Sequence, residues 1–170
     1  MIANLEALLA ILDKETACYR ELKTVLDDEA DSISLMPKDR FSEIQNAKES
    51  LVVRLQHLEK KRLHLVDEVG RALTSLDPPK TVSQLVRLVK SPYDSRLQTG
   101  ATQLRTIMGA VQSQNQHNRL LINQYLGLIE GSIKLLSDLI DESPIYHRPG
   151  TQPSSIGFQA GGGRILRGTV

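Results

Sequence analysis

Few residues in this chain have the types and spacing that catalysis or metal binding requires. His57 and His64 lie seven residues apart and could share a helix face, but no carboxylate at ligand spacing accompanies them. Cys18 has no nearby histidine to activate its thiol, and residues 161–163, three glycines, follow no strand and precede no helix. We therefore predict no catalytic residue, no metal site and no cofactor. We expect surface histidines and a buried or half-buried Cys18.

The charge balance argues against two further classes of function. The chain has 170 residues and a formal net charge of +1, and its basic run, Lys60 to Arg62, directly follows Glu59. A general nucleic-acid-binding protein would show a clear basic excess, so we predict no nucleic-acid partner. No segment approaches the roughly 18 uncharged apolar residues that a membrane helix needs, and the N-terminus does not resemble a signal peptide. We expect a cytoplasmic protein without stable membrane insertion.

The composition favours helices, because 40% of the residues are hydrophobic but only 4% are aromatic. Residues 1–36 carry apolar side chains at helical spacing, interrupted by Glu15 and Glu29. Residues 37–76 carry a regular seam, the row of positions with alternating spacings of three and four that faces a neighbouring helix. Its members are Phe41, Ile44, Lys48, Leu51, Leu55, Leu58, Arg62, Leu65, Val69, Ala72 and Leu76.

A third long helix is predicted over residues 93–142, with unusual exposed faces that are rich in Gln, Asn, Ser and Thr and poor in charge. Such faces are compatible with a surface that a partner covers. Its predicted seam is Leu97, Ala101, Leu104, Met108, Val111, Asn115, Asn118, Ile122, Tyr125, Ile129, Ser132, Leu136 and Leu139. Four glycines in this helix are tolerable only where packing compensates for them or where another helix approaches closely: Gly100, Gly109, Gly127 and Gly131.

Between the two longest helices, Thr81 and Gln84 resemble a capping box that starts a short helix. From Ser143 the helical period ends, and residues 143–170 are rich in Gly and Pro. We therefore predict an all-α fold, an elongated antiparallel bundle of three long coiled-coil-like helices with a short linker helix. The expected domains are a bundle over residues 1–142 and a flexible C-terminal tail over residues 143–170.

Four polar residues occupy seam positions, where polar groups cost stability but specify alignment: Lys48, Arg62, Asn115 and Asn118. We expect them to align the second and third long helices. Asn115 and Asn118 could instead belong to a partner-binding groove.

Residues 114–126 resemble the signature of the FlgN family, which are bacterial flagellar export chaperones for the hook-associated proteins that join hook to filament. The matching pattern is N-x-x-N-x-x-L-I at Asn115, Asn118, Leu121 and Ile122. The order of two long helices, a short helix, a third long helix and a C-terminal tail is also similar to that of the family. The resemblance covers roughly residues 3–142.

The resemblance implies a binding protein without catalysis. Such a chaperone captures the aggregation-prone terminal helices of a hook-associated protein, prevents premature assembly and delivers the client to the flagellar type III export gate. The implied partners are hook-associated proteins and components of the export gate and its ATPase. The candidate partner-binding residues lie in the last long helix and the tail: Asn115, Asn118, Leu121, Ile122, Tyr125, Ile129, Tyr146, Ile156, Phe158, Ile165 and Leu166.

A second hypothesis remains open at this point. A structural coiled-coil adaptor or oligomerisation protein would show the same regular seams and would self-associate through them. The low-charge polar helix and the apolar residues dispersed in the tail favour a client-binding protein over such a scaffold.

Overall fold

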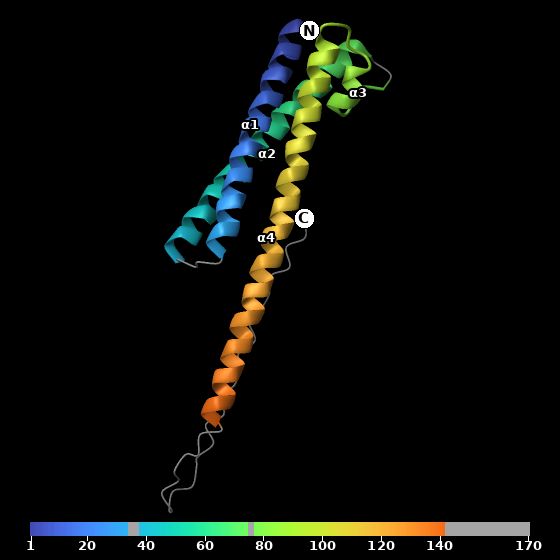
Figure 1. Ribbon diagram of the computed structural model, residues 1–170. Helices are drawn as coiled ribbons and strands as arrows, with labels where there is room; N and C mark the ends of the chain where they lie inside the picture. The colour runs from blue at the N-terminus through green and yellow to red at the C-terminus, as the bar shows by residue number, and fades with distance from the viewer. Residues whose placement is uncertain (34–37, 75–76, 142–170) are drawn as a thin grey trace, which may run out of the picture. The chain divides into compact units, whose positions relative to one another are not determined.

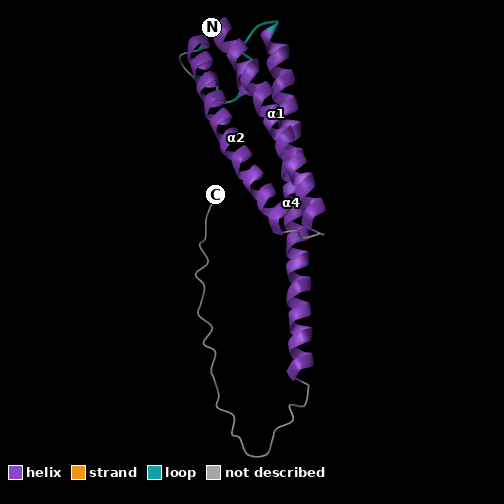
Figure 2. Cartoon of the chain, turned by 90° about the vertical axis from the view of Figure 1, so that its left-hand side faces the viewer, coloured by secondary structure: helices purple, strands orange, loops and turns teal. Residues whose placement is uncertain are grey.

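The computed structural model describes residues 1–33, 38–74 and 77–141, and all regular structure in these ranges is helical (Figure 2). The helices are α1 (Ile2–Ile33), α2 (Lys38–Leu73), the short α3 (Val82–Val86) and α4 (Tyr93–Asp141) (Figure 1). The chain divides into two units, Met1–Gly131 and Ser132–Val170. The packing described below belongs to the first unit, and it is all-α, the fold class that the sequence predicts.

Polar contacts between helices establish the direction of each one. Between α1 and α2, Glu15 pairs with Arg62 and Glu29 pairs with Lys48, so the residue numbers rise in one helix as they fall in the other. Between α1 and α4, Glu6 pairs with Arg96 and Glu29 accepts a hydrogen bond from Asn118, so the numbers rise together. Helices α1 and α2 are therefore antiparallel, whereas α4 runs parallel to α1, as expected for an up-down-up bundle.

The core consists of two neighbouring clusters, and α1 contributes to both. The first cluster joins all four helices and consists of Leu5, Leu8, Leu12, Val66, Val69, Val82, Leu85, Leu97 and Leu104. The second joins α1, α2 and α4 and consists of Ile11, Cys18, Leu22, Leu26, Leu55, Leu58 and Val111. Because α1 lies against both α2 and α4, it buries side chains over a wide face rather than a narrow stripe.

The short helix α3 begins as the sequence predicts. The Thr81 hydroxyl accepts a hydrogen bond from the Gln84 backbone N–H, at 3.2 Å, which satisfies one of the amides at the helix start. The Gln84 side chain accepts from the backbone N–H of Lys80 at 2.8 Å. Val82 and Leu85 are buried in the first core cluster, so α3 covers one end of the bundle.

The buried face of α2 departs from the predicted seam in its last turns. Ala72 is exposed and the helix ends at Leu73, whereas the predicted seam position Leu76 lies outside the described residues. After Leu58, the predicted seam residues Leu65 and Val69 still contact the core, but Val66 and Leu73 contact it as well. A straight α-helix has 3.6 residues per turn, so a strict seven-residue seam drifts away from the interface, and occasional four-residue steps correct the drift.

The predicted seam of α4 is also only partly right. Leu97, Leu104, Val111 and Asn118 are buried at intervals of seven, as predicted. Ala101 packs against the core as predicted, whereas between Leu104 and Val111 the contact shifts by one residue, because Ile107 packs against the core and Met108 is 41% exposed. Gly100 contributes to this register, since a Cβ atom there would lie 3.3 Å from Leu12 Cδ1. The close approach to α1 explains this glycine.

Candidate functional site

The described residues of α4 after Asn118 contain no buried side chain. In the first unit, the large apolar residues exposed on this stretch are Leu120, Leu126, Leu128 and Ile129. In the second unit, they are Ile133, Leu135, Leu136, Leu139 and Ile140. These positions lie on several sides of the helix, and their exposed fractions run from 47% at Ile129 to 69% at Ile140. A helix that is apolar on most sides is normally covered, so this stretch is the candidate functional surface.

The residues predicted to bind a partner occupy three different environments. Asn115 and Ile129 are exposed, and Leu121, Ile122 and Tyr125 are half-buried. Asn118 is only 1% exposed. The predicted tail residues lie outside the described residues: Tyr146, Ile156, Phe158, Ile165 and Leu166.

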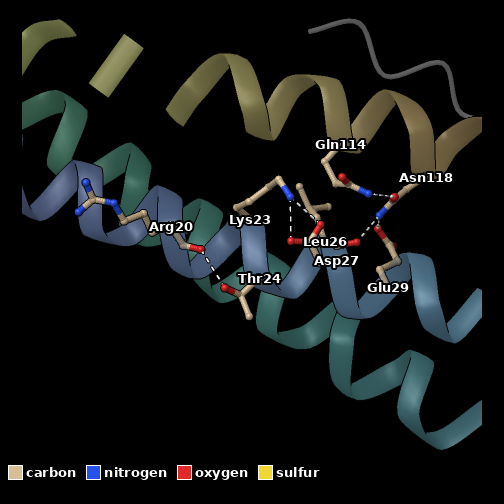
Figure 3. Close-up of polar contacts among 8 residues, drawn as sticks. All are labelled: Arg20, Lys23, Thr24, Leu26, Asp27, Glu29, Gln114 and Asn118. Atoms are coloured by element: carbon tan, nitrogen blue, oxygen red, sulfur yellow. Dashed lines mark hydrogen bonds and ion pairs between the residues drawn. The ribbon is translucent and has the colours of Figure 1, made fainter. Parts of the chain in front are cut away.

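The amide of Asn118 is fully engaged inside the bundle (Figure 3). Its Nδ2 donates to the backbone carbonyl of Leu26 at 2.7 Å and to Glu29 Oε2 at 2.8 Å, and its Oδ1 accepts from Gln114 Nε2 at 3.0 Å. Both donors and the acceptor therefore have partners, as a buried amide requires. Asn118 fixes α4 against α1 at the point where the buried face of α4 ends.

Glu29 links three helices through one buried carboxylate. Oε1 accepts from Gln45 Nε2 at 2.8 Å and from Lys48 Nζ at 2.7 Å, both on α2, while Oε2 accepts from Asn118 on α4. Burial by itself would raise the pKa of Glu29, but the hydrogen bonds from Lys48, Asn118 and Gln45 outweigh it and lower the pKa. The ionised carboxylate is therefore the form that the fold stabilises.

A second buried carboxylate, Glu15, behaves differently. Its Oε2 accepts from Arg62 Nε at 2.8 Å, and Arg62 also lies 3.6 Å from the exposed Glu59. Burial raises the pKa of Glu15, and the charge and hydrogen bond of Arg62 only partly oppose this rise. The ionised form of Glu15 is thus less favourable in the fold than in water.

These contacts correct the expected role of the polar seam residues. Lys48 and Arg62 align α2 with α1, and Asn118 aligns α4 with α1, so the prediction that they align the second and third long helices was wrong. The signal for the correct pairing is present in the sequence. Glu15 and Glu29, which interrupt the apolar period of α1, have the same spacing of fourteen residues as Lys48 and Arg62. Antiparallel helices bring two such pairs together in reverse order.

Asn115 lies at the edge of a groove with a volume of about 720 Å³. All four helices contribute to it, with Leu22 and Leu26 from α1, Val52 from α2, and Val82 from α3. The α4 side includes Met108, Gln112 and Asn115, which are exposed. Asn115 therefore faces an open surface of the bundle, whereas Asn118, one turn later, faces α1.

The other residues that the sequence singles out for their chemistry are Cys18, His57 and His64. Cys18 is buried, as predicted; its thiol lies 3.9 Å from the Leu51 carbonyl oxygen, and burial raises its pKa. His57 and His64 are exposed. In the ranges that the structure describes, no three His, Cys, Asp or Glu side chains gather as metal ligands. Likewise, none of the described helices has the length and apolarity to cross a bilayer.

Sequence reasoning missed part of the exposed surface of α4, because Leu136 and Leu139 were assigned to a buried seam. Both are exposed, as are Ile133 and Ile140. Two signals could have revealed this. Helix α4 has 49 residues, more than the 32 of α1 or the 36 of α2, so its neighbours cannot match it along its full length. Its last turns are also apolar on too many sides for a single seam.

The chain is similar to one family of known proteins. The family model described as FlgN protein matches residues 1–154, most of the chain, and extends beyond the end of α4. No curated protein and no solved structure matches the chain.

Proposed function

The chain belongs to the FlgN family of flagellar export chaperones, and we propose that it binds hook-associated flagellar proteins through α4 after Asn118. The observation that carries this proposal is the exposure of large apolar side chains on that stretch. Leu126 is 51% exposed and Leu136 is 59% exposed. A soluble helix rarely displays so many such groups unless a partner covers them.

The client that fits this surface is an amphipathic helix with an apolar stripe. Packing it along α4 would remove apolar area from water on both chains, which is the main driving force for helix-in-groove recognition. We assign direct contact to Leu121, Ile122, Tyr125 and Ile129, with Asn115 at the edge. Asn118, which is buried, holds α4 in position rather than contacting the client.

The tail residues predicted from the sequence belong to the same proposal. Tyr146, Ile156, Phe158, Ile165 and Leu166 would supply further apolar anchors to the client. A segment that becomes ordered on binding loses conformational entropy, which weakens the complex and favours reversible binding. Reversibility is needed because an export chaperone must release its client.

We further propose that the protein acts in the cytoplasm, prevents premature assembly of its client and delivers it to the flagellar type III export gate. Components of the gate and its ATPase would be its second set of partners. These steps follow from the role of an export chaperone, since a client kept unassembled must still reach the secretion machinery.

The test is calorimetric titration of the full chain with each hook-associated protein of the same organism. We expect saturable one-to-one binding to at least one of them. The double variant Leu126→Gln, Leu136→Gln removes apolar surface at exposed positions, so it should leave the bundle folded and weaken binding about tenfold or more. The matched control is Val53→Gln, an equally apolar-to-polar change on α2 at a position that is 61% exposed.

Three outcomes would contradict the proposal. The first is wild-type affinity in the α4 double variant, and the second is an equal loss in the Val53 control. The third is a folded chain that binds none of the hook-associated proteins but forms a stable oligomer, which would favour the adaptor hypothesis. A truncation after residue 142 tests the tail separately, because only the contribution of the tail residues should be lost.

A further inference from the structure

A second hollow lies between α1 and α2, within the first unit, and has a volume of about 650 Å³. Its apolar floor consists of Ala7, Ala10 and Ile11 from α1 and Leu65 from α2. Ala7 and Ala10 are exposed, Ile11 is 9% exposed and Leu65 is half-buried. The small alanine side chains leave room for another backbone to approach the helix pair closely.

The rim of this hollow is basic. It is formed by Lys14 on α1 and by His57, Lys60, Lys61 and His64 on α2, all of them exposed. The four α2 residues have the spacing i, i+3, i+4 and i+7, which places them along one face of the helix. No Asp or Glu is among the residues that line the hollow.

The lysines of the rim differ from the other charges between α1 and α2. Arg54 pairs with Glu21 at 3.0 Å and Arg62 pairs with Glu15. Within the described ranges, the ion pairs include none of the three lysines of the rim. His64 lies 3.8 Å from Glu68. The hollow thus combines apolar lining residues with three lysines that form no ion pair with a described carboxylate.

We propose that this hollow binds an acidic amphipathic helix of a partner protein. The apolar side of that helix would lie on Ala7, Ala10, Ile11 and Leu65, and its carboxylates would pair with the lysines of the rim. The lysines favour a partner with negative charge, and the hollow between two helices favours a partner segment that is itself helical. The residues that line the hollow come from α1 and α2, and none of them comes from α4.

Two other classes of anionic partner fit the hollow less well. A bilayer would need apolar side chains that project beyond the cations, whereas here Ala7 and Ala10 are short, Ile11 is 9% exposed and Leu65 is half-buried beside exposed lysines. A nucleic acid would use the lysines but would find no aromatic side chain on the floor for its bases.

The test uses a synthetic fluorescent peptide of about 18 residues, long enough to form a helix, with an apolar stripe of Leu and Ala flanked by Glu. Binding to the full chain is measured by fluorescence anisotropy, with a peptide of the same composition and shuffled order for comparison. We expect saturable binding that weakens as salt is added, because exposed charges are screened. The shuffled peptide should bind more weakly because its apolar residues no longer form one face.

Three variants of the chain locate the site. Lys60→Glu with Lys61→Glu reverses two rim charges, and Ala10→Phe fills the hollow without changing charge. Each should weaken binding about tenfold or more. The matched control is Lys80→Glu with Lys90→Glu, which makes the same change at two exposed lysines elsewhere and should retain affinity. Circular dichroism confirms that each variant is folded.

The proposal is overturned if the control weakens binding as much as the rim variant, because the effect would then be general electrostatics. It is also overturned if Ala10→Phe has no effect, since the floor would then be unused. Phosphatidylglycerol vesicles and a single-stranded oligonucleotide are tested in parallel. If either binds through the rim lysines while the peptide does not bind, the partner class is wrong.

Discussion

Replacing Glu29 with glutamine is the sharpest test of how the bundle is held together. The substitution keeps the shape of the side chain but removes the charge that faces Lys48, and it places an NH2 group among three donors. The Glu29 side chain is 1% exposed and that of Lys48 is 22% exposed. Removing one member of a buried ion pair costs about 3–5 kcal/mol, because the other charge remains buried and unpaired.

The partial exposure of Lys48 lets water solvate its ammonium group, so we expect the lower end of that range, about 3 kcal/mol. For a chain of this size the loss corresponds to a fall in Tm of about 6–12 °C. The assay is urea unfolding followed by far-UV circular dichroism, which gives the free energy of unfolding. The matched control is Glu21→Gln, which breaks an exposed pair with Arg54 at 3.0 Å and should cost less than about 1 kcal/mol.

The pH dependence provides an independent check of the same prediction. The pKa of Glu29 is lowered in the fold, so its stabilising contribution is present above the usual value of 4.5 and is lost as pH falls through the lowered pKa. The difference in unfolding free energy between the wild type and Glu29→Gln should therefore shrink in acid. Equal costs for the Glu29 and Glu21 variants, or a pH-independent difference, would refute the reasoning.

Three further changes test other parts of the fold. Arg62→Met should lower the free energy of unfolding by about 3–5 kcal/mol at neutral pH, because the Glu15 charge stays buried without its partner. The pKa of Glu15 is already raised, so this loss should shrink as the pH falls and Glu15 becomes protonated. Urea unfolding at two pH values would detect the change. Gly109→Ala should raise the free energy of unfolding by up to about 1 kcal/mol, because no atom lies within 4 Å of the added Cβ. Gly100→Ala should raise the free energy of unfolding less than Gly109→Ala, because the Leu12 side chain must shift to make room for the new Cβ atom. A larger increase for Gly100→Ala would contradict the close approach of Leu12 to Gly100. Deleting residues 143–170 should leave Tm nearly unchanged, since they lack a helical period of apolar residues; a large fall would show that they belong to the core.

Much of the fold is predictable from local pattern. The apolar period of each long segment identifies α1, α2 and α4, and Thr81 with Gln84 identifies the start of α3. These features depend on interactions within a few residues along the chain, so the sequence specifies them directly. The same pattern predicts short connections and hence the up-down-up order.

Local pattern does not predict which of the candidate binding residues are buried. Asn115 and Asn118 have equivalent positions in the N-x-x-N motif, yet one is exposed and the other is 1% exposed. The difference arises because Asn118 faces α1, where Leu26 and Glu29 accept its hydrogen bonds, whereas Asn115 lines an open groove. Which of the two asparagines faces a neighbour depends on how α4 lies against α1, which no property of α4 alone determines.

By itself, the sequence determined the helices, their order and the FlgN resemblance. Only the tertiary structure decided which charges pair, which face of each helix is buried and where burial along α4 ends. Helical periodicity depends on each segment's own residues, whereas pairing and burial depend on the relative register of two helices. If one helix shifted by one residue along its neighbour, every pair of contacting side chains would change. The hydrogen bonds of Glu29 with Lys48 and Asn118 are possible only in the register that this chain adopts.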